Sequence, residues 1–199
     1  MNARAYLVSL GDYPYYSLLA HYLVGMKSVL DVGCGARSPL ANIPKTFHSV
    51  GLDVFSESIK RSKKLRIHDE YIIGDVAQIA QLVSPKSFDA VVALDLIEHL
   101  TKREGETLLT SMEKIARKKV IVMTPNGFYR QEPYEKNPYQ VHKSGWTTQD
   151  FQSRGYRVLG IRGLKSLRGE YATIRWKPWL LWGVISALSQ YVLVWFPGF

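Results

Sequence analysis

The sequence predicts an α/β fold in which helices flank a mostly parallel central sheet. Short apolar segments alternate with helical patterns at intervals of roughly 20–25 residues, which is the rhythm of strands joined by crossover helices. One of these helical patterns places Leu108, Leu109, Met112 and Ile115 on a single face. Strands joined in this way lie parallel, so their carboxyl ends meet at one edge of the sheet.

Six strands are expected, each a short apolar run bounded by polar residues, glycine or proline. They cover residues 27–32, 47–54, 69–75, 87–95, 118–125 and 156–163. Helices are expected over 55–64 and 101–118, after a leading helix that begins at Asp12. Thr147 or Thr148 is expected to cap a further helix that ends at Gly155. A last antiparallel strand either comes from residues 170–176 or is missing.

The bulk composition is that of a globular protein with one sizeable core. The chain has 199 residues, of which 46% are apolar and 22% charged. Its single cysteine, Cys34, allows no internal disulfide, and the N-terminus does not have the pattern of a signal peptide. We therefore expect a cytoplasmic protein with one domain over residues 1–175 and an apolar tail over 176–199.

The tail contains no charged residue from Pro178 to Phe199. Three alternatives remain open for it: a helix that packs on this domain or on a partner, a helix that lies in the plane of a membrane surface, and a membrane span. Tryptophan and tyrosine are frequent in it and basic residues precede it, which suits a membrane interface. Contact with a membrane surface or with another protein through residues 178–199 is thus an expectation.

The net charge is +9, and the basic excess is uneven. Residues 60–66 read KRSKKLR, and residues 152–177 hold seven basic residues against one acid, Glu170. Such surfaces attract nucleic acid, anionic lipid or acidic substrates. The alternative interpretation is a solvated basic face with no ligand.

Four consecutive predicted strands end with an aspartate at the edge where ligands are expected. The first ends in Asp31-Val32-Gly33-Cys34-Gly35, and the others end at Asp53, Asp75 and Asp95. Glycines let the backbone turn tightly and approach a ligand, and an acid after the second strand can accept hydrogen bonds from ribose hydroxyls. Ser38 stands where a dinucleotide fingerprint needs its third glycine, which argues against a nicotinamide enzyme.

In order and spacing, these motifs resemble the class I S-adenosylmethionine-dependent methyltransferases, and among them the small-molecule enzymes that include quinone-biosynthesis O-methyltransferases. The resemblance covers about residues 10–165 and implies a Rossmann-like fold with S-adenosylmethionine as cofactor and S-adenosylhomocysteine as product. It places Asp31 near the methionine amino group, Asp53 at the ribose and Asp75 at the adenine. The full set of implied cofactor contacts is Asp31, Gly33, Cys34, Gly35, Asp53, Val54, Asp75, Val76, Leu94, Asp95 and His99.

Transfer of a methyl group to oxygen needs a proton acceptor, and histidine is the usual one. His99 follows the fourth strand and His142 follows the fifth, so both are catalytic candidates. The expected acceptor-binding residues are Tyr16, Tyr129, His142 and Trp146. No metal is expected, although Asp95, Glu98 and His99 together form a less favoured set of ligands for a divalent ion.

The sequence therefore predicts a methyltransferase that acts on a small molecule, with a lipophilic or anionic acceptor favoured. An RNA-directed methyltransferase and a noncatalytic cofactor-binding subunit are the alternatives. The protein is expected in the cytoplasm, with the tail allowing attachment at a membrane surface.

Overall fold

The computed structural model describes residues 14–131, 137–161, 163–167 and 174–194. Contacts divide the chain into two compact units. One comprises residues 22–145, and the other comprises residues 1–21 together with 146–199. The division expected at residue 175 stays a prediction.

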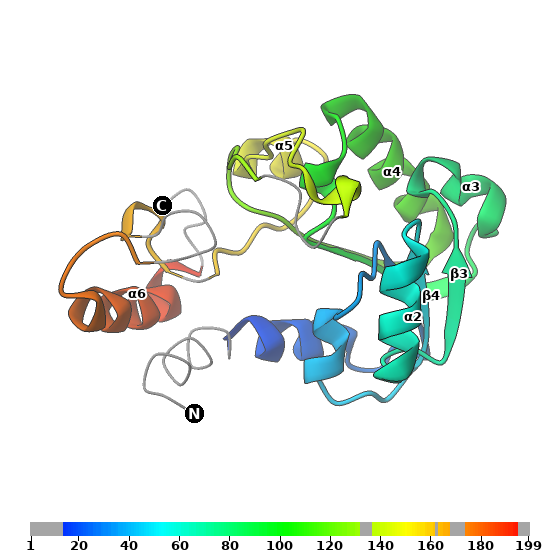
Figure 1. Ribbon diagram of the computed structural model, residues 1–199, viewed down its shortest axis with the longest axis horizontal. Coiled ribbons are helices and arrows are strands. Elements are labelled where there is room, and N and C mark those ends of the chain that lie inside the picture. The colour runs from blue at the N-terminus through cyan, green and yellow to red at the C-terminus, as the bar shows by residue number, and fades with distance from the viewer. Residues whose placement is uncertain (1–13, 132–136, 162, 168–173, 195–199) are drawn as a thin grey trace. The chain divides into compact units, whose positions relative to one another are not determined.

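Five strands form one sheet in the unit of residues 22–145. They are β1 (Ser28–Val32), β2 (His48–Asp53), β3 (Glu70–Ile73), β4 (Phe88–Leu94) and β5 (Ala116–Met123). All pair in parallel, in the order β3-β2-β1-β4-β5 (Figure 1). The predicted α/β class and the first five strands are thus confirmed. Because the order reverses between β1 and β4, the carboxyl ends of these two strands border the crevice where such sheets bind ligands.

Helices cover both faces of this sheet. On one face, Leu30, Val32 and alternate residues of the neighbouring strands pack against α4 (Lys102–Ile115) and α3 (Ile79–Leu82). On the other face lies α2 (Ser56–Lys64), whose Ser62 hydroxyl is 3.1 Å from the Tyr71 hydroxyl of β3. The predicted helices over 55–64 and 101–118 therefore form, and Thr101 with Glu104 completes a capping box at the start of α4.

The unit that includes residues 146–199 departs from expectation in one element. The predicted strand over 156–163 is wrong, because residues 156–161 form no strand. Instead, backbone amides within and shortly after this segment donate hydrogen bonds to the C-terminal helix. The Gly160 N–H donates to the Val194 carbonyl at 2.8 Å, and the Leu164 N–H donates to the Ser189 hydroxyl at 3.2 Å.

The remaining helices differ in length or position from those that the sequence patterns predict. Residues 14–23 are helical, and the expected start at Asp12 lies outside the described residues. Thr147 is the N-cap of α5 (Thr148–Gln152), which ends before Gly155. The tail forms α6 (Trp179–Leu193). Among the described residues, no helix combines the length and the hydropathy that a membrane span requires. Of the segment 170–176, residues 170–173 lie outside the description and Ile174 forms an isolated bridge.

Asp89 lies near the amino end of β4, at the edge of the sheet opposite the strand-end aspartates. Its carboxylate accepts the Lys27 backbone N–H at 2.9 Å, the Lys118 ammonium at 3.1 Å and the Arg117 guanidinium at 3.1 Å. These donors, the Lys27 amide first among them, hold the pKa of Asp89 at about 2, below its ordinary 3.8. The carboxylate thereby ties β1, β4 and β5 together at their amino ends.

Replacement of Asp89 by asparagine should remove an acid-sensitive part of the stability. The Asp89 pKa is lower in the folded chain than in the unfolded one, so its contribution is complete above about pH 4 and is lost as the pH falls toward about 2. Urea unfolding measured across this range should show a shallower fall in stability for Asp89→Asn than for the wild type. The control Glu113→Gln, on the exposed face of α4, should keep the wild-type slope.

Candidate active site

The glycine loop after β1 turns back across the end of β2. The N–H groups of Gly33 and Cys34 both donate to the Leu52 carbonyl, at 2.7 and 3.0 Å. Gly33 and Gly35 have positive φ angles of 68° and 59°, a region that residues with a Cβ rarely adopt. A Cβ on Gly33 would also lie 2.5 Å from a methyl of Leu96. A Cβ on Gly35 would have no neighbour within 4 Å, so the backbone there is open to a ligand.

Asp53, at the end of β2, holds this loop in place. One carboxylate oxygen accepts the Gly35 N–H and the other accepts the Phe55 N–H, both at 2.8 Å. Burial raises the pKa of the Asp53 carboxyl, and the two amides partly oppose that rise. Each oxygen keeps a second lone pair, so the same carboxylate can accept the two ribose hydroxyls that the resemblance assigns to it.

Asp31 is almost completely buried in β1, where two side chains contact the same oxygen of its carboxylate. The Ser38 hydroxyl donates to Oδ2, and His68 Nε2 lies 3.3 Å from it. Space for the imidazole exists because β2 has glycine at position 51, the register partner of Asp31. A Cβ on Gly51 would lie 2.6 Å from the His68 ring and 2.9 Å from Cys34 Sγ.

Asp31, Ser38 and His68 therefore form one buried polar group under the glycine loop. The sequence analysis assigned a role only to Asp31, whereas the structure also buries His68 beside it. Ser38 carried one signal, since it directly precedes the helical turn η1 (Pro39–Asn42) and caps the Leu40 amide of that turn. No local pattern links His68 to Asp31, because only the parallel pairing brings them together.

The remaining cofactor candidates also lie at this edge. Asp75 follows β3 and caps the turn η2 (Val76–Gln78) by accepting the Ala77 N–H at 2.9 Å. Leu94 is buried at the end of β4, and Val54 follows Asp53 directly. Asp95 has a positive φ of 55°, a conformation that is uncommon outside glycine and frequent at functional sites. Burial, followed by the charges of Asp31 and Asp53, raises the pKa of the Cys34 thiol, so it is no nucleophile at neutral pH.

Glu98 and His99 are buried in the short turn η3 (Ile97–His99) that follows β4. The Thr124 hydroxyl, just after β5, donates to the Glu98 carboxyl at 2.9 Å. Burial, followed by the charge of Asp95, raises the pKa of Glu98 to about 8. Burial, followed by the neighbouring His142, lowers the pKa of His99 to about 4. At neutral pH His99 is therefore uncharged, and the Glu98 carboxyl is protonated in most molecules.

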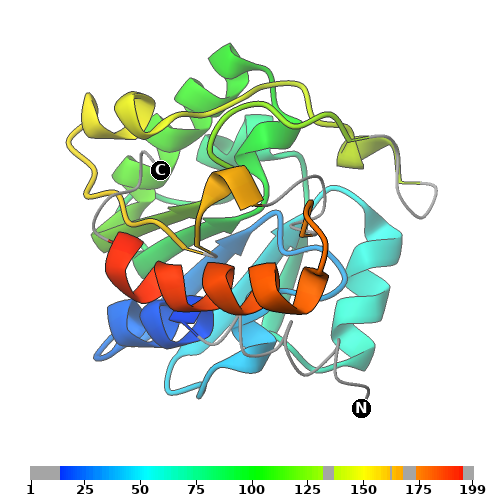
Figure 2. The ribbon, with the colours of Figure 1, turned by 90° about the vertical axis from the view of Figure 1, so that its left-hand side faces the viewer.

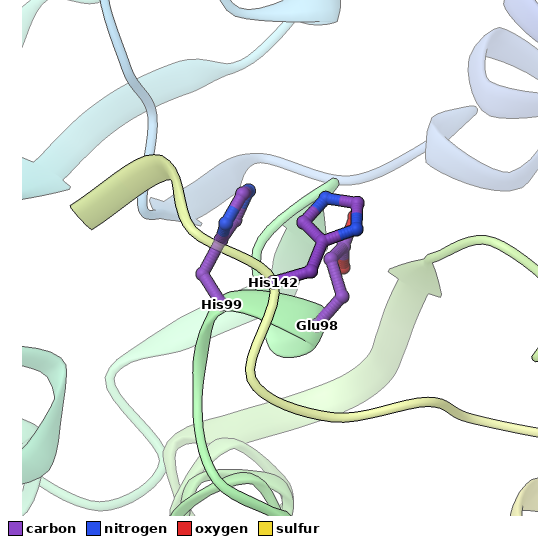
Figure 3. Close-up of side chains that lie close together, drawn as sticks. All are labelled: Glu98, His99 and His142. Atoms are coloured by element: carbon purple, nitrogen blue, oxygen red, sulfur yellow. The ribbon is translucent and has the colours of Figure 1, made fainter. Parts of the chain in front are cut away.

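His142 completes this cluster from the segment that follows β5. Its ring lies across that of His99, with the centroids 4.8 Å apart, and Figure 3 shows both rings beside the Glu98 side chain. His142 Nδ1 is 2.6 Å from the Tyr129 carbonyl, and His99 Nδ1 is 3.3 Å from the Val141 carbonyl. A carbonyl can only accept, so each Nδ1 donates and a neutral ring keeps its lone pair on Nε2.

Such a donor set suits a divalent metal ion as well as a proton. One ligand atom each of Glu98, His99 and His142 lies within 4.8 Å of the others. Imidazole with carboxylate fits zinc and other first-row metals, and a backbone carbonyl on the second ring nitrogen is a usual support for a metal-binding histidine. Because ligands of one such ion lie within about 4.2 Å of each other, the group must contract to hold it. His142 takes the place that the sequence analysis gave to Asp95.

The segment that carries His142 is bound to η3 through its backbone. The N–H groups of Lys143 and Ser144 both donate to the Glu98 carbonyl, at 2.8 and 3.1 Å. Tyr129 is half-buried beside this segment, and its role in acceptor binding stays a prediction. Trp146 is 1% exposed and lies against Phe151, and Tyr16 belongs to the helix of residues 14–23. Roles for Tyr16 and Trp146 in acceptor binding stay predictions.

A family model described as "Methyltransferase domain" matches residues 30–124. The matched span runs from β1 to just beyond β5, so it contains the glycine loop, the four strand-end aspartates and the Glu98–His99 turn. Residues 30–124 form a class I S-adenosylmethionine-dependent methyltransferase domain. Membership in this family implies S-adenosylmethionine as the cofactor, and the five strands are the ones that the apolar segments predicted.

Solved structures share the fold of this methyltransferase. The S-adenosylmethionine-dependent methyltransferase from Archaeoglobus fulgidus is 18% identical, with a TM-score of 0.54 over 96% of this chain and 88% of that chain. Magnesium protoporphyrin IX methyltransferase from Synechocystis PCC 6803 is 16% identical, with a TM-score of 0.53 over 77% of this chain and 75% of that chain. The small RNA methyltransferase HEN1 is 17% identical, with a TM-score of 0.55 over 72% of this chain but 21% of that chain. No curated protein matches the sequence.

Asp53→Ala should weaken binding of both S-adenosylmethionine and S-adenosylhomocysteine at least about tenfold, because it releases the glycine loop and removes the two charge-assisted hydrogen bonds to ribose that the resemblance assigns to Asp53. Titration calorimetry measures both affinities. The control Glu57→Ala removes an exposed carboxylate of α2 and should leave them unchanged. Equal affinities for wild type and Asp53→Ala would show that the methyltransferase does not hold the ribose through Asp53.

Gly51→Ala should destabilise the methyltransferase by about 1–3 kcal/mol, since the added methyl group displaces His68 and Cys34 from a close-packed site. Chemical denaturation measures this loss. The matched control is Gly183→Ala, where the added Cβ has its nearest neighbour at 3.9 Å, and there stability should stay equal or rise. A Gly51→Ala protein as stable as the wild type would contradict the close packing of His68 against β2.

Proposed function

We propose that this domain transfers the methyl group of S-adenosylmethionine to an oxygen of a small-molecule acceptor that binds beside Glu98, His99 and His142. The supporting observation is the cluster itself, which places two imidazoles with free Nε2 lone pairs and one carboxyl at the carboxyl edge of β4 and β5. Oxygen acceptors release a proton when they are methylated, and the His142 imidazole can receive it.

In the transfer, the bond between sulfur and the methyl carbon breaks and its electron pair stays on sulfur, giving S-adenosylhomocysteine. The acceptor oxygen forms the new bond to carbon, and its proton passes to His142 Nε2. The Tyr129 carbonyl fixes the orientation of the His142 ring. A proton on His142 favours the ionised form of the neighbouring Glu98, which then stabilises the imidazolium. His99, uncharged at neutral pH, accepts a hydrogen bond that orients the acceptor hydroxyl.

The acceptor class proposed here is a lipophilic phenol or acid. Aromatic side chains occur in the same unit. The rings of Phe55 and Tyr139 lie with their centroids 6.5 Å apart, and Phe128, next to Tyr129 in the sequence, is exposed. One fold neighbour is named as a magnesium protoporphyrin IX methyltransferase, which supports a small-molecule acceptor.

RNA is the second candidate acceptor, supported by the basic excess and by the name of the HEN1 fold neighbour. The position of the densest basic run argues against it. Residues 60–66 lie at the end of α2, which runs from the carboxyl end of β2 back to the amino end of β3. The run is therefore at the edge of the sheet opposite the methyl-transfer site. RNA binding with a steep salt dependence and RNA methylation would favour this candidate over the small molecule.

His142→Gln should lower the turnover of a lipophilic phenol or acid at least about a hundredfold, because the proton acceptor is lost. Its affinity for S-adenosylhomocysteine should stay at the wild-type value, since His142 is outside the set of cofactor contacts. The measurement is transfer of a radiolabelled methyl group across a panel of phenols, acids and RNA. His48→Gln, an exposed histidine at the amino end of β2, is the control and should be fully active.

The same assay separates a proton acceptor from a metal site. Enzyme treated with a chelator should keep its activity if His142 accepts the proton directly. Loss of activity with chelator, restored by magnesium, manganese or zinc, would instead assign Glu98, His99 and His142 to a metal ion. Tight binding of S-adenosylhomocysteine with no transfer to any acceptor would favour a noncatalytic subunit.

A further inference from the structure

The C-terminal helix α6 has its polarity reversed. In an ordinary surface helix the apolar stripe faces the core and polar residues face water. In α6 the polar Ser186 and Gln190 are buried, whereas a set of large apolar side chains is exposed. Those exposed side chains are Leu180, Leu181, Val184, Leu188 and Tyr191. Their spacing of three and four residues places them on one side of the helix, which we call the apolar face of α6.

Contacts within its own unit fix this orientation. Gly163 lies so close to α6 that a Cβ there would overlap the Ser186 carbonyl oxygen. The Ser189 hydroxyl accepts the Leu164 N–H at 3.2 Å and donates to the Ser186 carbonyl at 2.9 Å. At the end of the helix the Gly160 N–H donates to the Val194 carbonyl at 2.8 Å. Figure 2 shows α6, in orange to red, as one continuous helix. The polar side is thus held by Gly160, Gly163 and Leu164, and the apolar face points away from them.

The residues that precede α6 supply the chemistry of a lipid headgroup region. Arg175 and Lys177 are exposed, and between them the exposed Trp176 is anchored by its indole N–H, 3.4 Å from the Ser166 carbonyl. Trp179 and Tyr191 are exposed on the helix itself. No acidic residue occurs from 174 to 194. Basic residues next to an apolar helical face bind anionic bilayers, and tryptophan and tyrosine are enriched at the interface between lipid and water.

From this charge complementarity we infer that α6 docks the protein on an anionic phospholipid membrane. The apolar face enters the boundary between headgroups and acyl chains, with the helix lying in the membrane plane. Arg175 and Lys177 contact lipid phosphates. The inference goes beyond methyl transfer and does not depend on the identity of the acceptor.

The experiment uses the full chain and sedimentation with large vesicles. One set contains phosphatidylcholine alone and the other contains phosphatidylcholine with phosphatidylglycerol. The wild type should sediment with the anionic vesicles, less at high salt, and its tryptophan emission should shift to shorter wavelength. Leu181→Glu and Leu188→Glu should each weaken this binding at least about tenfold, because each places a charge in the apolar boundary.

The matched control is Val24→Glu, which adds the same charge to an exposed apolar residue that lies outside α6. This variant should bind vesicles like the wild type. Affinity for S-adenosylhomocysteine, measured for every variant, shows that the methyltransferase domain is folded and keeps this test separate from that of the acceptor.

Two results would overturn the inference. The first is no sedimentation of the wild type with anionic vesicles, or equal sedimentation of Leu188→Glu. The second is a wild-type dimer, seen by analytical ultracentrifugation, that Leu188→Glu dissociates while vesicle binding is absent; a second copy of the chain would then cover the apolar face. Binding of the wild type that Leu181→Glu and Leu188→Glu abolish, and Val24→Glu retains, supports it.

Discussion

The carboxylates at the carboxyl edge of the sheet must be supplied with hydrogen-bond donors, and this requirement shapes the site. Burial disfavours a carboxylate unless donors replace the water that it loses. Asp53 takes its donors from the backbone of the glycine loop, so satisfying the charge also closes the loop. Asp31 takes its donor from Ser38 and approaches His68, which needs the space that Gly51 leaves. The residues that hold these charges are therefore also the residues that form the floor of the cofactor site.

The balance of hydrogen-bond donors and acceptors is different around the turn η3, which follows β4. Around Glu98, His99 and His142 the groups that accept outnumber the groups that donate, and Thr124 is the donor to the Glu98 carboxyl. The two backbone carbonyls fix the imidazoles with their lone pairs free. The opposite pKa shifts of Glu98 and His99 both arise from burial, which disfavours charge on either group. Receiving a proton or a metal ion at this site therefore depends on ionisation of Glu98, whose negative charge would offset the added positive charge.

Short-range sequence patterns predicted the strands and helices that depend on apolar periodicity. The five strands, α2 and α4 follow from apolar periodicity, and the strand-end aspartates follow from the rule that parallel strands end at one edge. The pairing of His68 with Asp31 depends on tertiary contacts, so no local pattern reveals it. The expected strand over 156–163 failed for a related reason. Its alternation fits a strand, but Gly160 and Gly163 let the backbone approach α6, whose hydrogen-bonding groups take the place of a neighbouring strand.

The buried position of Cys34 has a practical consequence for measuring motion. It is the only cysteine of the chain, and its side chain contacts the region of Gly51 beneath the glycine loop. A thiol there reacts with an alkylating reagent only when the loop opens and water reaches it. The alkylation rate of the native chain therefore reports the free energy of local opening at the cofactor site, with no label introduced. A bound nucleoside that holds the loop closed slows this reaction, and the logarithm of the rate falls in proportion to the stability that the nucleoside adds.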